Sequence, residues 1–302
     1  ILSGLGAVAV PFLPHRIEDG YGLGVDTLHR CVESYHPNLI ITVDCGTSSV
    51  EAVAEAARLG IDVIVTDHHE PAAEGVAQAG AIVNPKLGGC PEDIRMLAGV
   101  GVAFKVCHGL IKAARQRKLD AAEKLDLKGY MELVAVGTVA DIVPLLKENR
   151  ILVYHGLHLL NQTQSVGMRT LIEAAGITGP VDTYHIGFMI GPRINAAGRL
   201  SDMTLGIECL LTDDPARADE LAKTLDGINR ERRAIEGDMR EQALLAAESL
   251  FDEGDEPPPA ICVFDPDFHE GVVGIVASRI KDKLHRPAFV FATSGAPGKE
   301  HE

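Results

Sequence analysis

The chain has 302 residues, of which 46% are hydrophobic, so it is long enough for two ordinary domains and can bury a sizeable core. Tryptophan is absent and aromatic residues make up only 4%, so we expect an aliphatic core. No uncharged apolar run reaches about 18 residues, which excludes a membrane-spanning helix. The net charge of −15 argues against a nonspecific nucleic-acid coat, although a site with bound cations and a few arginines could still hold phosphates.

The first residues and the cysteines indicate where the sequence starts in the fold and in which cellular compartment the protein works. Residues 1–10 lack the basic start and the small-residue cleavage site of a signal peptide. Because the chain starts without Met, and residues 1–6 look like a helix end that feeds a strand at residues 7–13, we expect the sequence to start inside a fold. Six cysteines occur without a Cys-x-x-Cys pair, which disfavours a zinc ribbon and fits a reducing, cytoplasmic setting.

The first third of the chain alternates strand and helix patterns. The apolar runs at residues 39–44 and 61–67 predict strands, the first of them buried on both faces, and residues 81–85 predict a short third strand. A helical pattern lies at residues 48–59, with Ser48 as its N-cap. This order predicts βαβ units and a parallel sheet.

Helical patterns then take over. We expect helices at residues 99–116, 121–137, 151–161, 168–176 and 215–251. The last is long and highly charged, which is typical of a solvated helix that connects two domains. Three prolines in residues 254–259 predict a linker. After it we expect a strand at 260–264, a helix at 271–283 and a strand at 288–291.

These elements predict an α/β fold with two parts. A parallel-sheet catalytic domain would occupy residues 1–212, and a connecting helix with its linker would occupy residues 213–257. Residues 258–302 would begin a smaller α/β domain, because they are too few to close a core alone.

Polar side chains follow two of the predicted strands. Asp44 ends the first strand, and Asp67 ends the second, directly before His68 and His69. Because ligands of open parallel sheets bind beyond the carboxyl ends of the strands, we expect these residues to converge. Carboxylates beside imidazoles suit Mn²⁺, Mg²⁺ or Zn²⁺. Taken singly, Asp44 could be a turn residue and the histidine pair a coincidence, but Asp-His-His after an apolar strand is a sharper signal.

A third acidic residue, Asp141, lies in the strongly apolar residues 137–145. A carboxylate among apolar neighbours is costly unless it is paired or binds a metal, so we predict a third contributor to the site. The alternative is that Asp141 caps the N-terminus of a helix.

Candidate phosphate-binding residues come later in the chain. Arg193, Asn195 and Arg199 lie in what reads as a glycine-bounded loop, and arginine forks match phosphate oxygens. Pairing of these arginines with surface carboxylates is the alternative in so acidic a chain. His269 and Glu270 precede an apolar helix, where they could meet a substrate or cap the helix.

Together these motifs resemble the DHH phosphoesterase superfamily, named after triplets such as Asp67-His68-His69, and within it the RecJ-like exonucleases. The resemblance runs in order through residues 14–23, 43–46, 66–69, 137–141, 191–199, 269–279 and 286–287. It implies a catalytic domain, a smaller DHHA1-type substrate-binding domain and two Mn²⁺ or Mg²⁺ ions. It also implies 5′→3′ removal of nucleotides from single-stranded DNA, in DNA repair and recombination. No repair partner follows from it.

The resemblance also implies a role for each residue. Asp44 matches the carboxylate that bridges the two ions, and His68 and Asp141 match ligands of one ion. His69 matches a catalytic residue at the scissile phosphate, with Asp67 in support behind the ligating histidine. Four residues match substrate-binding positions: Arg193, Asn195, Arg199 and His269.

Two motifs of the family are missing from this sequence. They are an Asp-rich segment ahead of residues 7–13 and a glycine-serine-arginine motif soon after Phe291. We therefore expect this chain to bind at most one metal well and to be weakly active or inactive. With so few aromatics we also expect little stacking of bases on rings.

Two other functions remain open. A DHH phosphodiesterase of short oligonucleotides or cyclic dinucleotides would use the same metal residues, and the acidic charge favours it slightly. A noncatalytic nucleic-acid-binding or scaffold protein is the third possibility, against which the presence of Asp44, His68, His69 and Asp141 argues.

Overall fold

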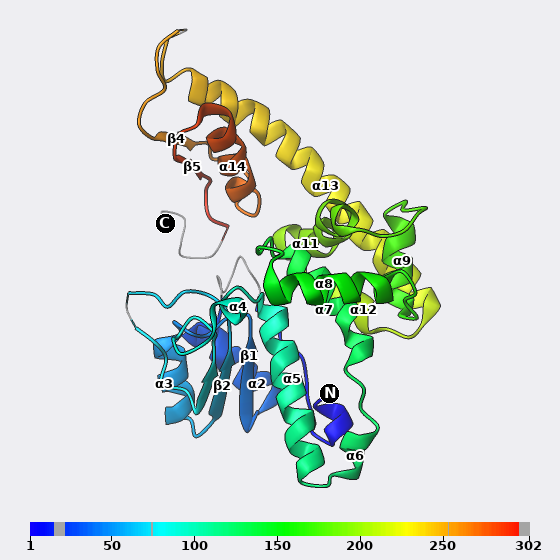
Figure 1. The fold of residues 1–302 in the computed structure, drawn as a ribbon. Coiled ribbons are helices and arrows are strands. Elements are labelled where there is room, and N and C mark those ends of the chain that lie inside the picture. Colours follow the sequence, from blue (N-terminus) through cyan, green and yellow to red (C-terminus); the bar gives the residue numbers. More distant parts are fainter. Residues whose placement is uncertain (15–21, 74, 253, 296–302) are drawn as a thin grey trace. The chain divides into compact units, whose positions relative to one another are not determined.

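The computed structural model describes residues 1–14, 22–73, 75–252 and 254–295 (Figure 1). Over these residues the chain forms two compact units, the first ending at Pro192 and the second starting at Arg193. No helix among the described residues is long and apolar enough to cross a membrane.

The first unit is built on a parallel sheet in the order β1-β2-β3, which confirms the predicted α/β class (Figure 1). The strands are β1 (Leu39–Val43), β2 (Asp62–Thr66) and β3 (Ala81–Val83). Ile64 of β2 lies opposite Ile41 and Ala81, so the three carboxyl ends meet at one edge. That edge is where the predicted site residues begin.

Helices α2 (Val25–Tyr35) and α3 (Val50–Arg58) pack with the sheet around a small aliphatic core. The core joins side chains of both helices to those of β2: Leu28, Val53, Ala56, Val63 and Val65. Each helix turns one apolar stripe toward the strands and its charged residues toward solvent, as the helical spacing predicts. The N-cap of α3 is Ser49, so the prediction of Ser48 as N-cap is wrong. The hydroxyl of Ser48 instead accepts a hydrogen bond from the N–H of Ala72.

Two expectations about strands are wrong. Residues 7–13 form no strand, because no described strand pairs with them to satisfy a ladder. Strand β1 is not buried on both faces: Leu39 is 45% and Val43 56% exposed. The reason is that β1 is the outer strand of the sheet that the described residues form.

Helices complete the first unit. They are η1 (Ser3–Leu5), α4 (Glu92–Arg95), α5 (Gly99–Gln116), α6 (Asp120–Glu123), η2 (Lys128–Tyr130), α7 (Met131–Ala140), α8 (Lys147–Leu160), α9 (Val166–Ala174), α10 (Thr183–His185) and the π-helical turn η3 (Ile186–Ile190). The single helix expected at residues 121–137 is therefore broken. Its chain turns where the Asp126 carboxylate accepts the N–H of Lys128.

Helices α7 and α8 approach each other very closely. A Cβ at Gly156 of α8 would lie 2.5 Å from the Cβ of Ala135 and 2.3 Å from the carbonyl oxygen of Met131. Only glycine fits there, so α7 is held in a fixed position along α8. That position matters because Asp141 follows directly after α7.

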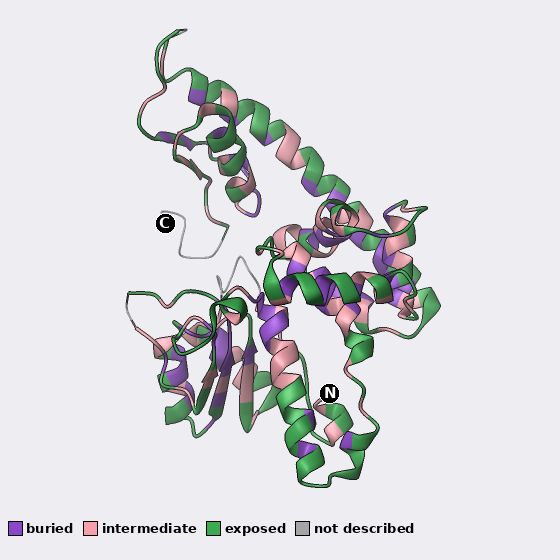
Figure 2. Ribbon diagram, in the orientation of Figure 1, coloured by how far each residue is buried: buried purple, intermediate pink, exposed green. Residues whose placement is uncertain are grey.

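Beyond Pro192 the chain forms the second unit. Its elements are α11 (Gly191–Leu200), which starts just before the boundary, α12 (Thr204–Leu211), α13 (Pro215–Glu248), β4 (Ile261–Phe264), α14 (Val273–Leu284) and β5 (Ala288–Phe291). The long helix is confirmed, and its exposed faces appear green in Figure 2, with buried residues spaced along one side. A core of Met239, Ile261, Val272 and Ile280 joins α13 and α14 to the parallel pair β4-β5.

The segment expected as a glycine-bounded loop at residues 191–200 is helix α11. Pro192 stands in its first turn, where the missing N–H costs nothing because first-turn N–H groups have no partner within a helix. Glycine and proline at this helix start therefore do not signal a loop, and the expectation is wrong.

Candidate metal centre

The site begins where β1 and β2 end. The N–H of Asp44 donates to the carbonyl of Thr66 (2.9 Å), and that of Asp67 donates to Val83 (3.1 Å), so the ladder holds both residues at the sheet edge. Asp44 has a left-handed backbone, with φ of 67°. Gly46 follows with φ of 107°, and a Cβ there would meet the Thr42 hydroxyl at 2.7 Å. A tight turn thus presents the Asp44 side chain.

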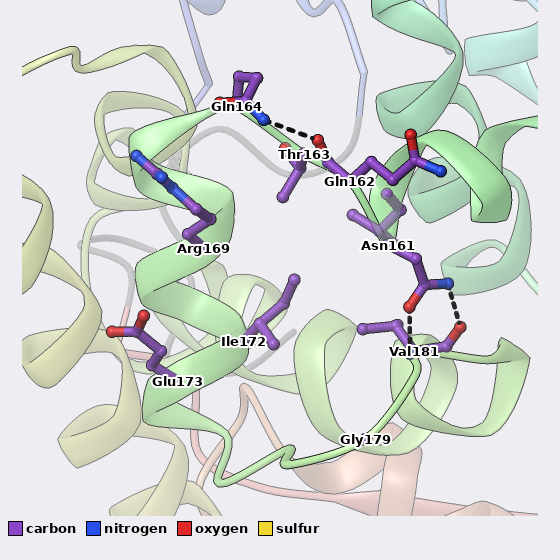
Figure 3. A pocket seen from close by; sticks show the side chains of 10 residues that line it. Asn161, Gln162, Thr163, Gln164, Arg169, Ile172, Glu173, Gly179 and Val181 are labelled. Atoms are coloured by element: carbon purple, nitrogen blue, oxygen red, sulfur yellow. Dashed lines mark hydrogen bonds between the residues drawn. The ribbon is translucent and has the colours of Figure 1, made fainter.

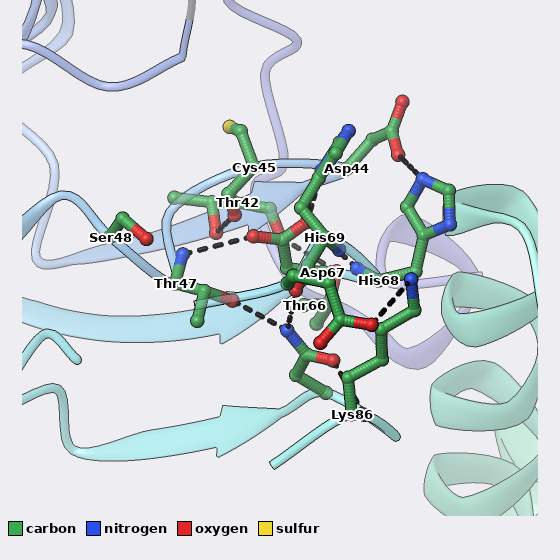
Figure 4. Close-up of polar contacts among 12 residues, drawn as sticks. Thr42, Asp44, Cys45, Thr47, Ser48, Thr66, Asp67, His68, His69 and Lys86 are labelled. Atoms are coloured by element: carbon green, nitrogen blue, oxygen red, sulfur yellow. Dashed lines mark hydrogen bonds and ion pairs between the residues drawn. The ribbon is translucent and has the colours of Figure 1, made fainter. Parts of the chain in front are cut away.

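Asp67 is a buried acceptor that organises the histidine pair (Figure 4). Its Oδ2 accepts the N–H of Thr47 at 3.0 Å. Its Oδ1 accepts the N–H of His68 at 2.7 Å and the Nδ1–H of His69 at 2.7 Å. Burial acts to raise the pKa of Asp67, but the hydrogen bonds from Thr47 and His69 outweigh it and leave the pKa below its usual value. The carboxylate therefore stays ionised and orients the ring of His69, whereas it holds only the main chain of His68 and not the ring that it was expected to support.

His68 directs its Nε2 at two carboxylates. Its Nδ1 lies 3.0 Å from the carbonyl oxygen of Leu97, which can only accept, so Nδ1 carries the proton. Its Nε2 lies 3.0 Å from Asp44 and 3.5 Å from Asp141 and makes no hydrogen bond. The side chain is buried, and closeness to Asp44 raises the pKa of His68 against the effect of burial. Two carboxylates that converge on one buried imidazole nitrogen are an arrangement that a bound cation would stabilise.

Asp141 reaches this point from the helical layer. It caps the C-terminus of α7, so the N-cap alternative is wrong, and Ile142 after it turns away with φ of 61°. Burial raises the pKa of Asp141, and the negative charge of Asp44 adds to the rise. A bound divalent cation would remove this cost of ionisation.

His69 stands on the open side of the cluster. Its ring is 60% exposed, and Asp67 fixes its Nδ1, which leaves Nε2 for the solvent side. The ligand atoms of Asp44, His68 and His69 lie within 4.8 Å of one another, the one such group of possible metal ligands among the described residues. Carboxylate oxygens with imidazole nitrogens suit Mn²⁺ and, less strictly, Mg²⁺.

Several supporting groups escaped the sequence reasoning. Asn84, after β3, donates to the Thr47 hydroxyl (2.8 Å) and to the carbonyl of His69 (2.9 Å). Its place at the end of the third predicted strand was an available signal. The carbonyl of Leu97 faces the His68 ring, and the bare Cα of Gly99 lies against the Asp44 side chain. Neither gave such a signal, because a main-chain contact leaves no mark on residue type.

The four predicted substrate-binding residues lie in the second unit, where their contacts differ. Arg193 pairs with Asp226 at 2.9 Å, the alternative that the sequence left open, while Asn195 is exposed. Arg199 donates to the carbonyl of Gly271 at 3.1 Å, and burial lowers its pKa. His269 accepts the N–H of Gly271 through Nδ1 at 3.0 Å. Most of the predicted motif at residues 14–23 lies outside the described residues.

A shallow hollow in the first unit lies between the ends of α8 and α9 (Figure 3). Asn161 in its wall both donates to and accepts from the main chain of Val181, at 2.9 and 2.7 Å. Gln164 donates to the carbonyl of Gln162. These polar groups brace the loop after α9, and the hollow shares no residue with the metal centre.

Known proteins share this arrangement. The DHH family, N-terminal domain, matches residues 3–138. The single-stranded-DNA-specific exonuclease RecJ of Dickeya dadantii is 42% identical over 300 residues, which are 97% of this chain and 52% of that protein. The chain therefore spans about half the length of the curated relatives it matches.

Solved structures agree with these relatives. A crystal structure of exonuclease RecJ bound to manganese superposes with a TM-score of 0.82 and 37% identity, covering 96% of this chain and 70% of that one. The structure of RecJ from Thermus thermophilus in complex with Mn²⁺ superposes with a TM-score of 0.79 and 35% identity. The match covers 96% of this chain and 40% of that one. The chain belongs to the DHH family and is a RecJ-like member of it.

Proposed function

We propose that this chain is the catalytic part of a metal-dependent exonuclease that removes nucleotides 5′→3′ from single-stranded DNA, in DNA repair and recombination in the cytoplasm. The observation that carries the proposal is the convergence of Asp44 and Asp141 on Nε2 of His68, at 3.0 and 3.5 Å. The names of the relatives support the substrate and the reaction. We assign residues 1–212 to the DHH domain, 213–257 to the connection and 258–302 to the start of a DHHA1-type domain.

The residues present fit a divalent cation, Mn²⁺ or Mg²⁺, two ions of which we expect in the complete enzyme. His68 would offer Nε2, Asp44 would bridge the ions, and Asp141 would complete the set. Related RecJ structures hold Mn²⁺ or Mg²⁺, which supports this choice. Such ions supply an activated water and stabilise the oxygens that attack and leave the phosphorus.

The chain's own residues then position the reacting phosphodiester. Asp67 holds His69 with Nε2 toward solvent, where the ring can contact a phosphoryl oxygen of the scissile group. Asn195 is exposed and can donate to a phosphate oxygen. Arg193 would exchange its pairing with Asp226 for a phosphate oxygen, while Arg199 and His269 shape the loop at Gly271.

The test is the hydrolysis of a long single strand, labelled at its 5′ end, with Mn²⁺ present. We expect slow release of labelled mononucleotides and none from Asp44→Ala, with duplex DNA resistant. Intact long strands beside a hydrolysed dinucleotide would instead establish the phosphodiesterase of short substrates, which the charge of −15 favours. Activity that survives Asp44→Ala unchanged would disprove the metal assignment.

A further inference from the structure

Two aromatic side chains lie exposed together in the first unit. Tyr184 of α10 is 61% exposed, and Phe188 of η3 is 69% exposed. Their rings contact each other, with centroids 5.0 Å apart and planes inclined by 32°. In a chain with 13 Phe and Tyr and no Trp, placing two rings side by side in solvent gives up burial that the core would have used.

The backbone beneath the pair is anchored to the helix that carries Asp141. A Cβ at Gly187 would contact Val139, at 3.8 Å, and one at Gly191 would lie 3.3 Å from the Cβ of Ala140. Val139 and Ala140 are the last residues of α7, directly before Asp141. The turn η3 therefore packs on the end of α7 at the metal centre, and Phe188 projects from between its two contact points.

Local contacts also fix the position of the pair. The Asp182 carboxylate accepts the N–H of His185, and the His185 ring accepts the N–H of Asp182, a reciprocal capping box at the N-terminus of α10. The Tyr184 ring lies edge-on to this held imidazole, with centroids 6.0 Å apart. A π-helical turn, which inserts one residue into a helix and is frequent at functional sites, then brings Phe188 beside Tyr184. The rings are thus pre-arranged before any ligand arrives.

We propose that Tyr184 and Phe188 form a stacking platform for a nucleobase of a bound single strand. The occupant follows from the proposed substrate and from the place of the pair: the backbone that carries Phe188 packs on the end of α7, directly before Asp141 of the metal centre. Every base offers a π-face, and stacking on an aromatic ring is tolerant of sequence. The inference rests on the proposed function for its ligand, and it replaces the expectation of little base stacking.

The test compares two single strands of equal length, one of thymidines and one of abasic sites, by fluorescence anisotropy with EDTA present. We expect Phe188→Ala and Tyr184→Ala to weaken binding of the thymidine strand roughly 5- to 160-fold, the range of one base–ring stack. Binding of the abasic strand should not change. Phe188→Tyr, which keeps a ring, should restore binding. Tyr154→Ala in α8, where the ring is 72% exposed, is the matched control and should bind as wild type.

Three outcomes would overturn the platform. One is equal binding of the two strands by the wild type. Another is an equal loss on both strands in the alanine variants. The third is unchanged DNA affinity in Phe188→Ala together with the loss of a dimer on gel filtration, which would make the pair a contact between copies. The hydrolysis assay is read separately, so an active enzyme without a platform is distinguished from a chain that is no nuclease.

Discussion

Replacing Gly99 with alanine tests how the metal centre is held. The Asp44 side chain lies against the bare Cα at the start of α5: an added Cβ would be 2.0 Å from Oδ1, 2.6 Å from Cγ and 2.8 Å from the Cβ of Asp44. Ordinary contact begins at 3.4 Å, so Oδ1 must move by 3.4 − 2.0 = 1.4 Å. Because the Cβ of Asp44 is placed by its backbone, a rotation of the side chain alone cannot relieve the clash, so the start of α5 or the Asp44 turn must shift and the carboxylate loses its present place beside His68.

The expected result is weaker metal binding by a folded protein. Loss of a supporting contact around a metal typically costs 10- to 100-fold in affinity, and we expect about that loss for Mn²⁺ in Gly99→Ala by isothermal titration calorimetry. Gly109→Ala in the same helix is the control, because a Cβ there has no neighbour within 4 Å. It should bind Mn²⁺ normally and gain up to about 1 kcal/mol in stability. Wild-type Mn²⁺ affinity in Gly99→Ala would refute the reasoning.

Three further predictions concern the first unit. Asp67→Asn should cost about 1–3 kcal/mol in unfolding free energy, measured with urea, because an amide cannot accept from all the groups that now donate to Asp67, from Thr47 to His69. Mn²⁺ at 100 times its dissociation constant should stabilise the wild type by about 2.7 kcal/mol and leave Asp44→Ala unaffected in thermal melts. Glu132→Gln should raise the melting temperature at pH 8, since burial raises the pKa of Glu132 and its ionised form is costly.

The direction of the Glu132 pKa shift decides the pH range in which Glu132→Gln stabilises the protein. A carboxyl whose pKa is raised by folding binds more protons in the folded state than in the unfolded state. Wild-type stability therefore falls as the pH rises from the usual pKa of glutamate through the raised pKa of Glu132. The advantage of Glu132→Gln should therefore vanish below the usual pKa of glutamate, and an advantage that persists there would contradict the cause. Wild-type stability in Asp67→Asn would show that Thr47 finds another acceptor. Equal Mn²⁺ stabilisation of Asp44→Ala would place the ion elsewhere.

The spacing of apolar residues along the sequence predicted much of the fold. The strands and the 34-residue helix α13 have strong, uninterrupted patterns, and the structure places them within a few residues of the prediction. The failures have local causes. Residues 7–13 have the composition of a strand but no partner among the described strands, and the helix expected at 121–137 is broken by the side-chain turn at Asp126. Neither a missing partner nor a competing side-chain acceptor is visible in hydrophobic spacing.

The candidate site was predictable as far as it depends on residue type. Strand ends predicted that Asp44 and His68 converge, and the cost of a carboxylate in an apolar segment pointed to Asp141. The contact of Asp44 with Gly99 and that of His68 with the Leu97 carbonyl involve the main chain, so no residue pattern signals them. The exposed pair Tyr184–Phe188 depends on a π-helical turn, whose inserted residue is likewise invisible in composition.

The close approach of α7 to α8 at Gly156 has a mechanical consequence. Asp44 and His68 belong to the sheet edge, whereas Asp141 is placed by helix packing. An ion held by all three would therefore link the sheet to the helical layer. Any substitution that widens the gap between α7 and α8 would then move Asp141 and weaken the binding of the ion, although the substituted residue lies outside the metal centre. Tolerance to mutation should therefore be lowest along this helix pair, where a bulkier residue is felt as a change in ligand spacing.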